Sequence, residues 1–62
     1  MRTILIKCHK TKAVDMIQNV PDTVASNTVV EAWQREHNGR GCTWKVAETN
    51  DLVKCMIEGA KL

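Results

Sequence analysis

The side chains best suited to chemistry are three cysteines and two histidines, at Cys8, His9, His37, Cys42 and Cys55. Structural zinc sites usually contain paired ligands about two to four residues apart, because a short knuckle aims both side chains at one ion. No such pair is present, and the adjacent Cys8 and His9 would point to opposite faces of a strand. The spacing therefore predicts no metal and no cofactor. Three cysteines without a CxxC motif predict reduced thiols and not a disulfide framework.

A cysteine nucleophile with a histidine base is the one catalytic arrangement that this composition leaves open. At 62 residues the chain is expected to form a single domain, 1–62. A domain of this size buries only about 60% of the surface that its unfolded chain exposes. Little room remains for both a core and a pocket that encloses a substrate. We therefore expect no enzymatic activity.

Basic residues gather near the N-terminus. Arg2, Lys7, Lys10 and Lys12 all precede the first acidic residue, Asp15, although the net charge of the chain is only +2. The cluster lies where a strand is expected to end and a helix to begin, and the free amides of a helix N-terminus attract anions. The candidate residues for binding an anion or an acidic partner are Lys7, His9, Lys10, Lys12, Arg35 and Arg40.

Ser26, Val30 and Trp33 are spaced like the start of a helix-turn-helix recognition helix, which this short segment resembles. In that motif a serine caps the helix and the two apolar residues face the core. The resemblance covers about ten residues, and Pro21 stands where the preceding helix should run. It implies nucleic-acid binding through an outer helix face made of Glu31, Gln34, Arg35 and Asn38.

Two segments in the first third of the chain have a clear period. Thr3–Cys8 is rich in β-branched residues, and its Ile4-Leu5-Ile6 run predicts a central or interface strand that is covered on both faces. From about Lys12 the period changes to that of a helix, which Pro21 would end. The apolar positions of this expected helix are Ala13, Met16, Ile17 and Val20.

The stretch 28–48, which holds both tryptophans, has two readings. Asn38-Gly39 could be the turn of a hairpin that sets Trp33 opposite Trp44. The apolar residues of 29–38 sort better onto one face of a helix, and Thr28 and Glu31 fit a capping box. We favour the helix, followed by a half-buried strand over 42–48 and a last helix that begins after 49–51.

The predicted fold class is therefore α+β, with a single-layer sheet of two to three strands packed against two to three helices. The expected order is β-α-α-β-α, or β-α-β-β-α if 28–48 forms the hairpin. A sheet with so few strands is marginal in water, so we expect a homodimer in which Ile4-Leu5-Ile6 pairs with its copy. The expected core is Ile4, Ile6, Val14, Ile17, Trp33, Trp44, Val46, Val53 and Ile57.

No segment approaches the length of about 18 apolar residues that a membrane span needs, and no signal peptide is recognisable. We expect a cytoplasmic protein. A chain too small for a pocket can still offer a surface, so the expected function is that of a small protein-binding regulator, such as an inhibitor, an antitoxin-like factor or an accessory subunit. The alternative is nucleic-acid binding through the basic N-terminal cluster and the helix-turn-helix-like helix.

Overall fold

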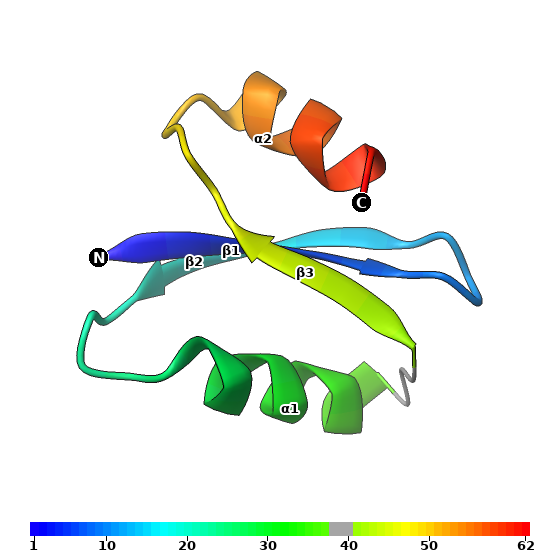
Figure 1. Ribbon diagram of the computed structural model, residues 1–62, viewed down its shortest axis with the longest axis horizontal. Helices are drawn as coiled ribbons and strands as arrows, with labels where there is room; N and C mark the ends of the chain where they lie inside the picture. Colours follow the sequence, from blue (N-terminus) through cyan, green and yellow to red (C-terminus); the bar gives the residue numbers. More distant parts are fainter. Residues whose placement is uncertain (38–40) are drawn as a thin grey trace.

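The computed structural model describes residues 1–37 and 41–62, and these contain three strands and two helices. In chain order they are β1 (Arg2–Cys8), β2 (Val14–Val20), α1 (Ser26–His37), β3 (Cys42–Val46) and α2 (Leu52–Ala60). The strands form one antiparallel sheet in the order β2-β1-β3. Figure 1 shows α1 on one face of this sheet and α2 on the other. The α+β class is confirmed, whereas both expected element orders are wrong.

β1 is the central strand, as its apolar run predicted. Ile4, Leu5 and Ile6 are all fully buried, at 0% exposure. Ile4 and Ile6 belong to the core beneath α1, while Leu5 points to the opposite face, towards α2. Because β2 and β3 occupy both edges of β1, this strand cannot also pair with a second copy. The expected route to a homodimer is therefore wrong.

The segment expected to form the first helix is instead the edge strand β2. Arg2 pairs with Val20 and Ile4 pairs with Ile17, so β2 contains one extra residue at this point, a β-bulge. Asn19 takes a positive φ of 58° in the bulge. The extra residue turns both Ile17 and Val20 towards the core beneath α1. Their spacing of three residues therefore reflects a bulge and not a helical turn.

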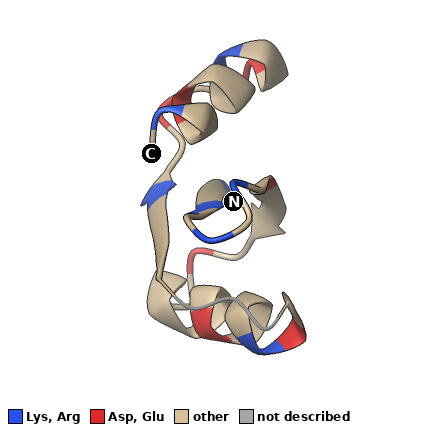
Figure 2. Ribbon diagram, turned by 90° about the vertical axis from the view of Figure 1, so that its right-hand side faces the viewer, with Lys and Arg blue, Asp and Glu red and all other residues tan. Residues whose placement is uncertain are grey.

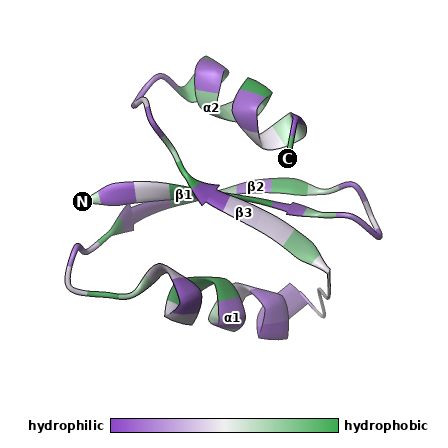
Figure 3. Cartoon of the chain, viewed as in Figure 1, coloured by the Kyte–Doolittle hydropathy of each residue, from purple (hydrophilic) through white to green (hydrophobic). Residues whose placement is uncertain are grey.

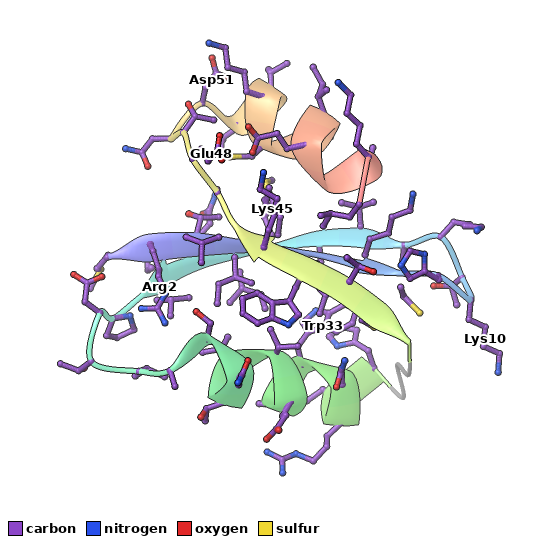
Figure 4. All side chains as sticks on the ribbon, viewed as in Figure 1. Arg2, Lys10, Trp33, Lys45, Glu48 and Asp51 are labelled. Atoms are coloured by element: carbon purple, nitrogen blue, oxygen red, sulfur yellow. The ribbon has the colours of Figure 1, made fainter. Side chains whose placement is uncertain are left out.

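α1 confirms the helical reading of the tryptophan-rich stretch, and the hairpin over 28–48 is wrong. Asn38-Gly39, the turn of that hairpin, lies outside the described residues. Val30 and Trp33 are buried against the sheet, and Figure 4 shows the Trp33 ring between α1 and the strands. The indole Nε1 donates a hydrogen bond to Asp15 Oδ2 on β2, 2.8 Å away.

Arg2 fixes the chain that leads into α1. Its guanidinium donates to the carbonyl oxygen of Pro21 at 2.7 Å, to the carbonyl oxygen of Val24 and to the hydroxyl of Ser26, the first residue of the helix. The guanidinium of Arg2 therefore joins β1 to the loop that precedes α1 and to the first residue of the helix. The expected N-cap, Thr28, lies inside the first turn of α1.

The last strand and the last helix are confirmed, but the core differs from the expected one. Trp44 and Ile17 pack partly buried against the α1-side core. Four residues expected to be buried are exposed, with exposed fractions of 38% for Val14, 39% for Val46, 66% for Val53 and 51% for Ile57. Neither described helix is long and apolar enough to cross a membrane.

Candidate functional site

The outer face of α2 carries a row of exposed apolar side chains, which we call the α2 stripe: Val53, Met56, Ile57 and Ala60. Val53 is 66% exposed, Met56 60% and Ile57 51%, and Ala60 is also exposed. Offsets of three, four and seven residues place all four on one side of a helix. Figure 3 shows hydrophobic positions recurring along α2, in the layer that lies alone on its side of the sheet. Val53 and Ile57, which were expected in the core, thus face solvent.

The inner face of α2 is made of small residues. Cys55 is 1% exposed, and Gly59 is buried against the sheet. A Cβ atom at Gly59 would lie 2.7 Å from Cγ1 of Val14, so the helix approaches the strands closely at this point. Cys55 and Gly59 are four residues apart, and this small-residue spacing was the signal in the sequence that they face inward.

Both ends of α2 are tied down by side chains. Asp51 is the N-cap, and its Oδ1 accepts from the backbone amides of Val53 at 3.0 Å and Lys54 at 3.3 Å. At the other end, Lys7 Nζ donates to the carbonyl oxygen of Ala60 at 2.8 Å. A cation is favourable at a helix C-terminus, where carbonyl groups are left without helical partners. Lys7, a predicted anion-binding residue, thus stabilises the end of α2.

An ion pair between Lys45 on β3 and Glu58 on α2 joins the helix to the sheet. Figure 4 shows Lys45 pointing from β3 towards the helix. Its Nζ lies 3.9 Å from Glu58 Oε2 and 4.0 Å from Glu48 Oε1. Glu58 is therefore turned inward, and two exposed cations, Lys54 and Lys61, border the α2 stripe on that flank.

Three other predicted site residues, His9, Lys10 and Lys12, lie in the exposed turn between β1 and β2. His9 Nε2 forms a hydrogen bond with Thr43 Oγ1 on β3, and Figure 4 shows Lys10 pointing away from the body of the molecule. Because β2 follows this turn, no helix begins here. The expected helix N-terminus is therefore absent at this turn, whereas anion binding by its basic side chains stays a prediction.

The remaining predicted residues do not complete this cluster. Arg35 lies in the last turn of α1, and Arg40 is outside the described residues. Figure 2 shows Lys and Arg positions in all three layers. The strand β2, and not a helix, precedes α1 in the described chain, so the resemblance to a helix-turn-helix is not borne out.

Among residues 1–37 and 41–62, no three His, Cys, Asp or Glu side chains come together in a way that could hold a metal ion. Compared with known proteins, the chain matches no protein-family model, no curated protein and no solved structure. The function must therefore be inferred from the surface of the molecule itself.

Proposed function

We propose that this protein binds another protein through the α2 stripe and acts in the cytoplasm as a small regulator, such as an inhibitor, an antitoxin-like factor or an accessory subunit, and not as an enzyme. The exposure of Val53, Met56 and Ile57, each more than half accessible, carries this proposal. Leaving such side chains in water forgoes about 1.5–3 kcal/mol each relative to full burial. Contiguous exposed apolar residues typically mark an interaction site. The three free cysteines support a reducing compartment.

The partner that fits this surface has an apolar groove with an acidic rim. An amphipathic helix commonly docks by laying its apolar face into a groove, through anchors at i, i+3, i+4 and i+7. The α2 stripe has this spacing at Val53, Met56, Ile57 and Ala60. Lys54 and Lys61 border it, so acidic side chains on the partner would steer and orient the encounter.

A second copy of this chain fits the same surface less well. In an antiparallel pair of helices, each edge meets the same edge of its copy. The border that carries Lys54 and Lys61 would then face its own lysines, which repel each other. A homodimer stays a separate prediction, and a single species near 7.0 kDa in sedimentation equilibrium at tens of micromolar would contradict it.

The proposal is tested by replacing the stripe without disturbing the core. Tagged wild-type protein is used to capture its partner from the native host, the partner is then produced alone, and its affinity is measured by calorimetry. We expect Val53→Gln combined with Met56→Gln to weaken binding about tenfold or more, because apolar anchors dominate such interfaces. The matched control is Glu31→Gln with Arg35→Gln on exposed positions of α1, which should bind within about twofold of wild type.

Binding of the stripe variant at wild-type affinity would contradict the proposal. The alternative, nucleic-acid binding, predicts a different pattern. It requires retention on heparin that falls steeply with salt, because each phosphate contact releases counterions. Retention should then vanish on replacing Lys10 and Lys12, the exposed lysines of the β1–β2 turn, while the stripe variant stays unaffected.

A further inference from the structure

Two cysteines that are far apart in the sequence lie directly opposite each other in the sheet. Cys8 is the last residue of β1, Cys42 is the first of β3, and the two are register partners. Figure 1 shows this end of the sheet, where β1 reaches its arrowhead and β3 begins. The fold thus places a pair of thiols on neighbouring strands, although the sequence shows no paired motif.

The backbone hydrogen bonds of Cys8 reveal which kind of cross-strand pair this is. The Cys8 amide donates to the Ala13 carbonyl at 2.9 Å, and the Cys8 carbonyl accepts from the Lys12 amide at 2.8 Å. Both groups point towards the β2 side, so Cys8 and Cys42 form a non-hydrogen-bonded pair across β1 and β3. In such pairs the Cα atoms lie about 4.5 Å apart and the side chains are closest. That separation falls within the range that a disulfide spans without backbone movement.

Both thiols lie at the core beneath α1, and Cys42 is the more exposed of the two. Cys8 is 5% exposed, and Cys42 is partly buried and packs against the same core beneath α1. Cys55, the third cysteine, belongs to α2 on the other side of the sheet, where its Sγ donates to the Thr49 carbonyl at 3.2 Å. Cys55 therefore cannot reach the pair and serves as an internal control.

The pKa values of the two thiols are shifted in opposite directions. The backbone amide of Thr11, followed by its hydroxyl and the Lys10 amide, lowers the pKa of the Cys8 thiol to about 7, against the opposing effect of burial. Burial, followed by the charge on Cys8, raises the pKa of Cys42. Near neutral pH, Cys8 thus supplies a thiolate, the reactive form, next to a protonated Cys42.

We propose that Cys8 and Cys42 form a peroxide-reactive dithiol, which closes to a reversible disulfide between β1 and β3. The Cys8 thiolate attacks one oxygen of hydrogen peroxide, so an S–O bond forms and the O–O bond breaks. The hydroxide that leaves takes a proton from solvent, which balances the proton that Cys8 lost on ionising, and becomes water. Cys42 sulfur then attacks Cys8 sulfur, the S–O bond breaks and the departing hydroxide takes the Cys42 proton. The two sulfurs lose two electrons in total, which reduce one peroxide to two waters, and an added dithiol reverses the change. A small oxidant is implied because Cys8 is nearly covered.

The test uses the reduced full chain, treated with a small excess of hydrogen peroxide, quenched with catalase, unfolded and alkylated. Of the three free thiols, two should no longer react with the alkylating reagent. The product should run as a single chain, with no disulfide between chains. Peptide mapping should join the Cys8 peptide to the Cys42 peptide, and dithiothreitol should restore all three thiols. The Cys55→Ser variant should give the same crosslink.

Three results would overturn the proposal: three alkylated thiols after peroxide, a crosslink that includes Cys55, or a crosslink between two chains. The Cys42→Ser variant adds an independent readout, because it removes the sulfur that resolves the intermediate. Labelling of Cys8 by dimedone, which traps sulfenic acid, should rise at least tenfold over wild type in this variant. Equal labelling in the two proteins would contradict the two-step reaction.

Discussion

At the scale of single residues, a few polar side chains hold the layers together. Arg2 joins β1 to the start of α1, Lys7 joins β1 to the end of α2, and Asp15 joins β2 to Trp33. Each of these bonds connects residues at least 18 positions apart. The spacing of residues along the chain cannot reveal such partners, so the sequence alone groups Lys7 with the anion-binding candidates and not with the end of α2.

The bond between Asp15 and Trp33 should be measurable as stability. Trp33 is 8% exposed, so Asp15→Ala would leave the indole N–H of a buried residue without the carboxylate that accepts its hydrogen bond. We expect a loss of about 1–3 kcal/mol in the free energy of unfolding, measured by urea denaturation. Asp15→Asn keeps an oxygen acceptor and should lose less than half as much. An Asp15→Ala variant as stable as wild type would show that the hydrogen bond contributes nothing.

The acidity of Cys8 predicts the pH dependence of its reactivity. The thiolate is the reacting form, so the alkylation rate of Cys8 should rise about tenfold per pH unit below its pKa and level off above it. With a pKa of about 7 the plateau should begin near that pH, whereas a thiol with the ordinary value of 9.0 would continue to rise. The rate is followed by mass spectrometry of the Cys8 peptide, with urea-unfolded protein as the control. A Cys8 rate that still climbs between about pH 8 and pH 9 would contradict the lowered pKa.

At the scale of elements, the sequence predicts the helices and strands whose hydrophobic periodicity is not interrupted by a bulge. β1, α1, β3 and α2 follow their patterns, and β1 is central because three successive apolar residues need cover on both faces. β2 was missed because its bulge inserts one residue between Ile17 and Val20. Both side chains then face the same core, and a strand imitates the helical spacing. Only the pairing with β1 reveals the bulge, and a single sequence does not contain it.

The close approach of α2 to the sheet can be tested with a double-mutant cycle. Alanine favours helices by about 1 kcal/mol over glycine, yet a Cβ at Gly59 would lie 2.7 Å from Val14 Cγ1. Valine is stiff about χ1, so we expect Gly59→Ala to destabilise the protein by about 1–3 kcal/mol.

In the Val14→Ala background that clash is absent, and Gly59→Ala should become neutral or stabilising by up to about 1 kcal/mol. Urea unfolding of the four proteins gives the coupling energy between the two sites. Effects that add within about 0.3 kcal/mol would show that the helix is not held by this contact.

At the scale of the whole molecule, the core is small because α2 contributes little to it and leaves its larger apolar side chains exposed. Among residues 1–37 and 41–62, eight apolar side chains are buried, and only one of them, Cys55, comes from α2. The spacing of Val53, Met56 and Ile57 predicted a helix but assigned its apolar side to the core, because periodicity locates a face without showing what covers it. The smaller residues Cys55 and Gly59 pack inward instead, and the larger ones remain available for binding.

The α2 stripe is the proposed protein-binding surface of the molecule. Its most direct test is a calorimetric titration of the isolated partner into wild-type protein and into the Val53→Gln, Met56→Gln variant. Both side chains are more than half exposed, so the free energy of unfolding of the variant should lie within about 0.5 kcal/mol of the wild-type value. We expect a folded variant that binds the partner about tenfold more weakly than wild type, or more weakly still. A folded variant that binds the partner as tightly as wild type would contradict it.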